Sequence, residues 1–221
     1  MNFKLFFLQI PMTYGIFEER GNYMKAAELK KHLKKGEVYR RSELAKWSNA
    51  VDRHLGILET EGALQKLSPG LYYAPKETAF GIAPPDEYKV VRSFLKDDRF
   101  LLTSPNSYNN LGVGTTQLYN ARTVYNHKRH GAFKLGNRKF FFHKKSHFPK
   151  KATEEFLLVD LVNNLDSLAE DKEFVLQNVF KKAMTMNLKK LRRSVIEYGS
   201  VKAKKLFSPL FANEENMSHA I

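Results

Sequence analysis

The stretch from Ser42 to Pro75 constrains the fold of this chain more than any other. Ser42 is placed to cap a short helix over residues 43–47, and the pair Ser48-Asn49 is placed to cap a second helix. Apolar residues then recur at intervals of three and four positions, so one face of the second helix is predicted to be buried. The recurring residues are Val51, Leu55 and Leu58.

A predicted hairpin follows these two helices. Gly62 is placed to end the second helix, and Ser68-Pro69-Gly70 forms a turn between short strands over residues 63–67 and 71–73. An amphipathic helix over residues 23–35 precedes the stretch, with Met24, Ala27 and Leu33 on one side. Helices and a hairpin in this order are the outline of a winged helix-turn-helix, which we expect over residues 1–78.

A helix-turn-helix places its second helix in the DNA major groove, while flanking groups hold phosphates. The polar side of the second predicted helix carries residues 49, 52–54 and 56, so we expect it to face DNA. Base contacts are expected from Ser48, Asn49 and Arg53. The full set of candidate DNA-binding residues is Arg40, Arg41, Ser42, Lys46, Ser48, Asn49, Arg53, His54, Lys66 and Tyr72. Two helices and a hairpin also occur as inert packing modules or protein-docking surfaces.

A second domain is expected over residues 79–221, after a boundary rich in proline and glycine. It opens with a helix over residues 86–96 and a short helix after Ser104-Pro105. Strand patterns follow between residues 118 and 148, with Gly136-Asn137 as a hairpin turn, and predict a small antiparallel sheet. Helices return from Thr153 onwards, with Thr153 placed to cap the first of them. The expected class is therefore α+β, with a helical C-terminal part.

Charge is unevenly distributed along the chain. The formal net charge is +14, and no acidic residue occurs between Asp98 and Glu154. Such a bias is typical of a solvated basic face, and it also attracts DNA, RNA or an acidic protein. The residues that we expect to form this patch are Arg122, Lys128, Arg129, Arg138 and Lys139.

The sequence gives little support for a catalytic site or a metal-binding site. The chain has no cysteine, which excludes disulfides, thiolate zinc sites and a cysteine nucleophile. Four histidines lie close together without a carboxylate, so we expect polar strand positions and no metal site. They are His127, His130, His143 and His147. Gly112 to Thr116 lacks the lysine of a phosphate loop. We expect no cofactor and a non-enzymatic protein.

Three segments resemble the AbiEi-type antitoxins of bacterial type IV toxin-antitoxin systems. They are VDRHLGILETEGALQKLSPGLYYAPK from Val51, SPNSYNNLGVGTTQLYNARTVYN from Ser104, and GAFKLGNRKFFFHKK with FPKKATEEFLLVDLVNNL. The resemblance implies a winged helix-turn-helix that binds inverted repeats in its own promoter. It also implies a second domain that counteracts a nucleotidyltransferase-like toxin encoded alongside. Ser48, Asn49, Arg53 and Lys66 match the DNA-facing positions.

Two other function classes stay open from the sequence. One is a winged-helix transcription regulator whose second domain senses a ligand or oligomerises. The other is a nuclease-like enzyme, against which the absence of acids across the predicted sheet argues. The first residues lack a secretory pattern, and no apolar run approaches membrane-spanning length, so we expect a cytoplasmic protein without a membrane partner.

Overall fold

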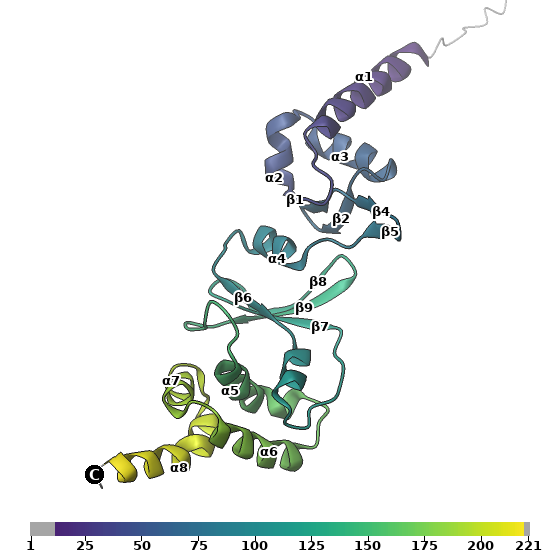
Figure 1. Ribbon diagram of the computed structural model, residues 1–221. Helices are drawn as coiled ribbons and strands as arrows, with labels where there is room; N and C mark the ends of the chain where they lie inside the picture. The colour runs from purple at the N-terminus through teal and green to yellow at the C-terminus, as the bar shows by residue number, and fades with distance from the viewer. Residues whose placement is uncertain (1–11, 219–221) are drawn as a thin grey trace, which may run out of the picture. The chain divides into compact units, whose positions relative to one another are not determined.

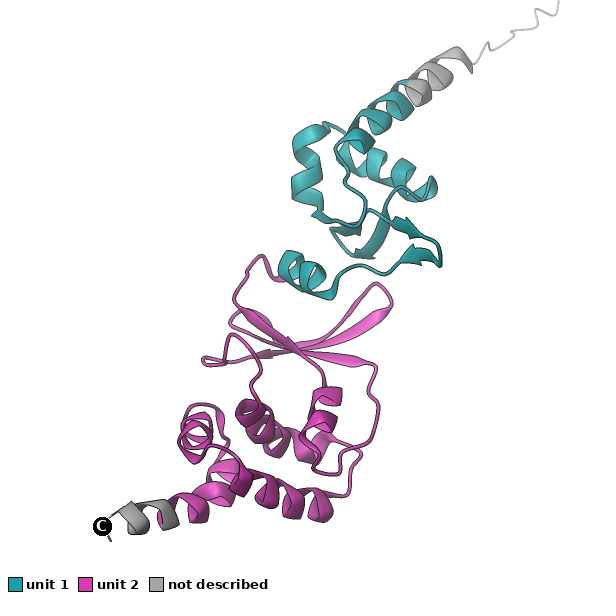
Figure 2. Ribbon diagram, viewed as in Figure 1, with its two compact units in different colours: residues 1–94 teal, residues 95–221 magenta. Residues whose placement is uncertain are grey.

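The computed structural model describes the backbone of residues 12–218 and the side chains of residues 21–212. The chain divides into two units, residues 1–94 and 95–221 (Figure 2). Each unit contains helices and a small sheet, so the expected α+β class is confirmed. The first eleven residues of the expected N-terminal domain lie outside the described part.

Unit 1 is built from four α-helices, one 3-10 helix, a three-stranded sheet and a second hairpin (Figure 1). The antiparallel sheet has the order β1-β3-β2, and β4 pairs with β5. The elements are α1 (Met12–Lys31), β1 (Val38–Arg40), α2 (Arg41–Leu44), the 3-10 helix η1 (Ala45–Trp47), α3 (Val51–Thr60), β2 (Gln65–Ser68), β3 (Leu71–Tyr73), β4 (Lys76–Thr78), β5 (Gly81–Ala83) and α4 (Glu87–Leu95).

The boundary between the units falls sixteen residues later than the sequence suggested. The β4–β5 hairpin belongs with unit 1, because the Tyr73 hydroxyl donates a hydrogen bond of 2.8 Å to the Ala83 carbonyl. The start of α4 is also held there, since Lys89 forms an ion pair with Glu37. Proline and glycine between residues 75 and 85 therefore shape a hairpin inside unit 1 and do not mark its end.

The core of unit 1 lies between its helices and the sheet. Leu29 of α1, Leu44 of α2, and Leu55 and Leu58 of α3 are at most 1% exposed. The predicted apolar face of the second helix is thus confirmed. Burying such a side chain contributes about 1.5–3 kcal/mol, so this cluster holds the three helices together.

Two details of the first helix differ from the prediction. The helix spans Met12–Lys31 and ends before residues 32–35. Its buried positions are Ala26 and Leu29, whereas Met24 is 72% exposed. The helical period alone could not predict which side of α1 is buried, because that depends on how α1 packs against α3.

The capping prediction for the next helix is also wrong. Ser42 lies inside α2, whose N-cap position is Arg40. The Arg40 backbone N–H donates to the Glu43 carboxylate at 2.8 Å, which supplies the capping contact. Strand β1 runs directly into α2, so the helix starts two residues earlier than the hydroxyl suggested.

Unit 2 contains a four-stranded sheet followed by helices. Its strand order is β6-β7-β9-β8, and the helix α5 packs against η2 (Figure 1). The elements are β6 (Phe100–Thr103), the 3-10 helix η2 (Pro105–Leu111), β7 (Ala121–Asn126), β8 (Gly131–Leu135), β9 (Arg138–Lys144), α5 (Glu154–Asn164), the 3-10 helix η3 (Leu165–Ser167), α6 (Lys172–Thr185), α7 (Leu188–Tyr198) and α8 (Val201–Ser218).

The sheet of unit 2 is mixed, whereas the sequence predicted an antiparallel one. Strands β8 and β9 form the expected hairpin, and Gly136 in its turn has a φ of 62°. Because β8 lies at the edge, β9 returns beside β7 in the same direction, and these two strands pair in parallel. The sequence also missed β6, a short apolar run that pairs antiparallel with β7.

The helical C-terminal part is confirmed, including the cap at Thr153. Thr153 accepts a hydrogen bond from the Phe156 N–H at the start of α5, at 3.3 Å. Asp171 accepts one from the Phe174 N–H at the start of α6, at 3.1 Å. No helix among the described residues has the length and apolarity needed to cross a membrane.

A buried carboxylate joins three elements of unit 2. Asp160 of α5 is 4% exposed and accepts hydrogen bonds of 2.7 Å from both the Tyr108 and the Tyr125 hydroxyls. The Asn164 amide donates to it at 3.1 Å. Burial raises the pKa of Asp160, and the three hydrogen bonds oppose that rise. The carboxylate therefore fixes η2 and β7 to α5.

Removing this carboxylate should destabilise unit 2. The substitution Asp160→Ala leaves two buried hydroxyls without their acceptor, so we expect a loss of about 2–4 kcal/mol in the free energy of unfolding. Urea unfolding followed by circular dichroism measures it. The matched control is Asp166→Ala, which removes an exposed carboxylate paired with Lys172 and Lys202 and should lower stability by less than about 1 kcal/mol. Equal losses would contradict this account.

Candidate nucleic-acid interface

The helix α3 divides its side chains between the core and the surface. Val51, Leu55 and Leu58 are buried, as predicted. Asn49, just before the helix, and Asp52 and Arg53 in its first turn are exposed. The exposed side therefore offers an amide, a carboxylate and a guanidinium at the N-terminal end, which is the end that enters a major groove in helix-turn-helix proteins.

His54 does not belong to this exposed side, contrary to the prediction. Its side chain is 1% exposed, and its Nδ1 lies 2.7 Å from the Ser48 hydroxyl. Its Nε2 has no hydrogen-bond partner within the described part of the chain. Burial lowers the pKa of His54, and the nearby charges of Lys25 and Arg53 lower it further. A position three residues after Val51 falls on the core side, so the residue type misled the assignment.

Ser48 also has a different role from the expected base contact and helix cap. It is half-buried, and its hydroxyl is engaged with His54. The N-cap position of α3 is Ala50, which has no side-chain cap. Ser48 thus ties the turn before α3 to the buried side of that helix.

Tyr72 lies in the core, so the expected contact with a DNA backbone is wrong. The residue is 6% exposed, and burial raises the pKa of its hydroxyl. It sits on β3, the central strand, opposite Tyr39 on β1 and Lys66 on β2. All three residues of β3 are buried, whereas the Lys66 side chain on the edge strand β2 is exposed.

Arg41 connects three elements of unit 1. Its Nε lies 2.6 Å from Oδ1 of Asp52, in the first turn of α3. Its backbone N–H donates to the Gly70 carbonyl, in the β2–β3 turn, at 2.9 Å. The hydrogen bond from Arg41 lowers the pKa of Asp52 and raises that of Arg41. The start of α2, the start of α3 and the β2–β3 turn are therefore held side by side.

The remaining candidates lie at or near the surface. Arg40 is half-buried and forms an ion pair with Glu43 at 2.8 Å. The structure thus leaves an accessible group of candidate side chains on unit 1, with His54 and Tyr72 excluded. The exposed members are Arg41, Ser42, Lys46, Asn49, Arg53 and Lys66.

The basic patch expected on unit 2 is divided between two faces of its sheet. Arg138 lies two positions from Phe140 on β9, and Arg122 is opposite Phe140 on β7, so both arginines share its face. Lys139 lies on the other face. Lys128 sits apart from both, since its Nζ is 2.8 Å from the Lys96 carbonyl. Arg129 lies 5.9 Å from the Phe133 ring centre.

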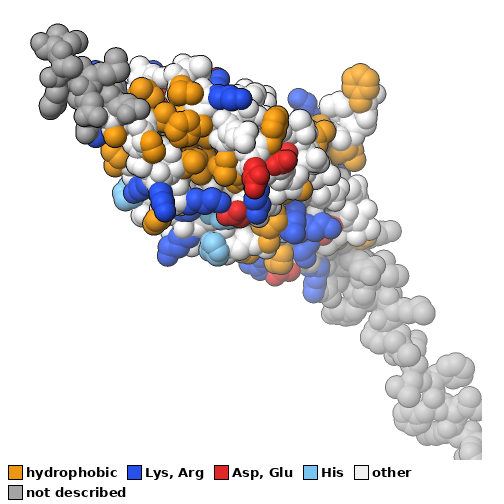
Figure 3. All heavy atoms as spheres, turned by 90° about the horizontal axis from the view of Figure 1, so that it is seen from below, with side chains coloured by type: hydrophobic (Ala, Val, Ile, Leu, Met, Phe, Trp, Pro, Cys, Tyr) orange, Lys and Arg blue, Asp and Glu red, His pale blue; other side chains and the backbone are white. Residues whose placement is uncertain are grey.

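Cations are nevertheless abundant on the surface. On the face drawn in Figure 3, Lys and Arg side chains are spread widely and Asp and Glu side chains are sparse. In the sequence, residues 99–153 contain lysines and arginines but no acidic residue, and so contribute much of the net positive charge. The patch is therefore a diffuse cationic surface and not one cluster.

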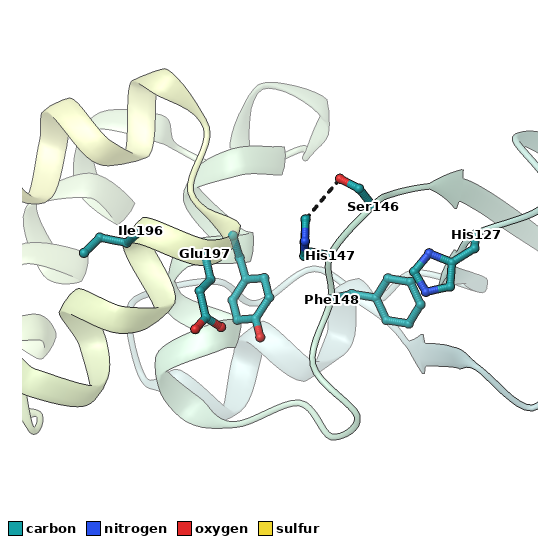
Figure 4. Close-up of a pocket in the computed structure, with 7 residues that line it drawn as sticks. His127, Ser146, His147, Phe148, Ile196 and Glu197 are labelled. Carbon is teal, nitrogen blue, oxygen red and sulfur yellow. Dashed lines mark hydrogen bonds between the residues drawn. The ribbon is translucent and has the colours of Figure 1, made fainter.

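A pocket of about 430 Å³ lies in unit 2 between the loop after β9 and the end of α7 (Figure 4). The His127 and Phe148 rings lie 4.6 Å apart on one side, and Nδ1 of His147 is 3.2 Å from the Ser146 hydroxyl. Glu197, on the other side, pairs with Arg193 at 2.8 Å. The lining residues are His127, Ser146, His147, Phe148, Ile196, Glu197 and Tyr198.

Sequence reasoning missed this pocket. Two of the four histidines flagged in the sequence line it, but nothing in the sequence joins them to α7, fifty residues later. Within the described part, no three or more side chains of His, Asp or Glu gather where they could hold a metal ion. Its lining combines aromatic rings, such as Phe148 and Tyr198, with polar side chains, such as Ser146 and Glu197.

Two comparisons with known proteins gave no match. Neither a scan against protein-family models nor a search of curated proteins finds a match for this chain.

The burial of His54 should make the stability of unit 1 depend on pH. Because its pKa is lowered in the folded state, stability is complete above the ordinary value of 6.5 and falls as the unfolded state takes up a proton below it. Urea unfolding followed by Trp47 fluorescence should therefore show a loss of stability between pH 7.5 and 5.5. The loss should shrink in His54→Gln and persist in His147→Gln, which changes an exposed histidine. An unchanged pH dependence in His54→Gln would refute this role.

Proposed function

We propose that unit 1 is a winged helix-turn-helix that binds double-stranded DNA, and that the protein is a non-enzymatic cytoplasmic regulator. The order α1-β1-α2-α3-β2-β3, with the sheet order β1-β3-β2, supports this proposal. The observation that carries it is the position of Arg41, which holds the first turn of α3 beside the β2–β3 turn. These are the two elements that such proteins present to DNA together.

In this proposal α3 enters the major groove and its neighbours hold the backbone. Asn49 and Arg53 read base edges, since an amide suits adenine and a guanidinium suits guanine. Lys46, Lys66 and Arg41 contact phosphates, which give affinity without sequence preference. Arg40 supports them from its partly buried position beside Glu43.

We further propose that the protein is an antitoxin of the AbiEi type. The resemblance described above supports this assignment, and the division into two units fits it. Unit 1 then binds inverted repeats in the promoter of its own operon and represses it. Unit 2 counteracts a nucleotidyltransferase-like toxin encoded beside it, with its cationic surface as the contact for acidic groups of that partner.

A gel shift on the DNA upstream of the gene tests the DNA-binding proposal. We expect a shift that survives competitor DNA, weakens with salt and is lost when Asn49→Ala and Arg53→Ala are combined, because each specific base contact contributes about 1–3 kcal/mol. The control is His147→Gln in unit 2. Binding that is unaffected by both substitutions in unit 1 would rule out α3 as the helix that contacts the bases.

Asp52 should weaken DNA binding in the wild-type protein. Its carboxylate engages Arg41 and repels phosphates, so Asp52→Asn should release the guanidinium and tighten binding several-fold at low salt. Arg41→Gln should weaken binding. Both affinities come from fluorescence anisotropy with the same duplex. If Asp52→Asn weakens binding as Arg41→Gln does, the position that the ion pair gives to α3 outweighs the repulsion between Asp52 and the phosphates.

A second candidate function rests on the pocket in unit 2. A pocket of about 430 Å³ with aromatic walls fits a small ligand, so the chain could be a winged-helix regulator whose second unit senses a metabolite. The neighbouring gene separates the two proposals. A nucleotidyltransferase-like neighbour whose toxicity this protein suppresses supports the antitoxin, and its absence favours the ligand sensor.

A further inference from the structure

One face of the β8–β9 hairpin in unit 2 carries an exposed ring among cations. Strand β9 alternates, so Lys139, Phe141 and His143 share one face, while Phe140 and Phe142 on the other face are each 1% exposed. Phe141 is 37% exposed. Its cross-strand neighbours are the small residues Ala132 on β8 and Thr123 on β7. The ring is therefore partly open to solvent, unlike the two phenylalanines on the other face.

Two lysines lie beside this ring, and neither pairs with a carboxylate in the part of the chain that the structure describes. Lys134 is directly opposite Lys139 across the hairpin, and like charges in that position destabilise a strand pair. Among the described residues, no acidic side chain forms an ion pair with either lysine. The Lys139 ammonium instead lies 4.8 Å from the centre of the Phe141 ring. An anion bound at this point would relieve the repulsion.

Further rings continue the same face. His143 follows Phe141 by two positions, about 6.8 Å along an extended strand, and is half-buried, with its ring centre 5.6 Å from that of Tyr125. Its ring lies 5.8 Å from that of His130, which is exposed just before β8. Flat rings at strand spacing beside cations combine the two features that bind single strands, namely stacking surfaces for bases and charge for phosphates.

We propose that this surface, defined by Lys134, Lys139 and Phe141, binds single-stranded nucleic acid. Phe141 stacks on an unpaired base, and the two lysines hold the adjacent phosphates. A duplex does not suit the surface, because its bases are stacked on one another and present no free face to a protruding ring. The site lies in unit 2 and is independent of duplex recognition by α3, so it goes beyond the proposed function.

The test uses the full-length protein and two labelled oligonucleotides, a 15-mer of deoxythymidine and a 15-mer of uridine, in fluorescence anisotropy. We expect binding to at least one of them, and the preferred one shows whether the ligand is DNA or RNA. Phe141→Ala should weaken binding about tenfold, whereas Phe141→Tyr should keep it within about twofold, because a phenol ring also stacks. Lys134→Gln should reduce the salt dependence of binding by about one phosphate contact.

Two controls separate this proposal from duplex binding by unit 1. Arg53→Ala should leave single-strand binding unchanged, and Phe141→Ala should leave the gel shift on the upstream duplex unchanged. Phe141→Trp should retain binding and show fluorescence quenching on addition of the oligonucleotide, which reports stacking at this position. Failure of the wild-type protein to bind either oligonucleotide would overturn the proposal, as would equal affinities of wild type and Phe141→Ala.

Discussion

Burial of one face of α3 determines what unit 1 can present to another molecule. Leu55 and Leu58 pack into the core with His54 beside them, and Ser48 bonds the imidazole from the turn that precedes the helix. The helix cannot rotate without exposing this face. Asn49, Asp52 and Arg53 are therefore directed outwards, where another molecule can contact them.

Unit 2 depends on a polar interaction inside its core. Asp160 joins η2 and β7 to α5 through two tyrosine hydroxyls, and a buried carboxylate so bonded holds these elements in one arrangement. The sheet above it can then expose cations on both of its faces. Core packing thus has a different consequence in each unit. In unit 1 it fixes which side of α3 faces outwards, and in unit 2 it supports a sheet with a charged surface.

Much of the fold could be predicted from the sequence, since it follows from local patterns. The turn at Gly136, the cap at Thr153 and the apolar face of α3 each depend on residues close in sequence. The predictions were wrong where contacts between distant segments determine the structure. The parallel pairing of β7 with β9 and the inward side of α1 depend on tertiary packing, which periodicity does not encode.

The candidate site shows the same division. The exposure of Arg53 and Asn49 follows from helical spacing. His54 and Tyr72 were assigned to the surface because they carry polar atoms, although their side chains are buried. The link from Arg41 to Asp52 and Gly70 joins three elements and left no trace in the sequence. Residue type thus suggested which side chains are candidates, and packing determines which of them are exposed at the surface.

Hydrogen exchange with and without the upstream duplex tests the central claim most directly, because it locates the contact on the chain. Bound DNA is expected to protect backbone amides over residues 41–53 and in the β2–β3 turn, with little change in α5 and α6. Protection confined to unit 2, with the α2–α3 region unaffected, would contradict the assignment of unit 1 as the DNA-binding element.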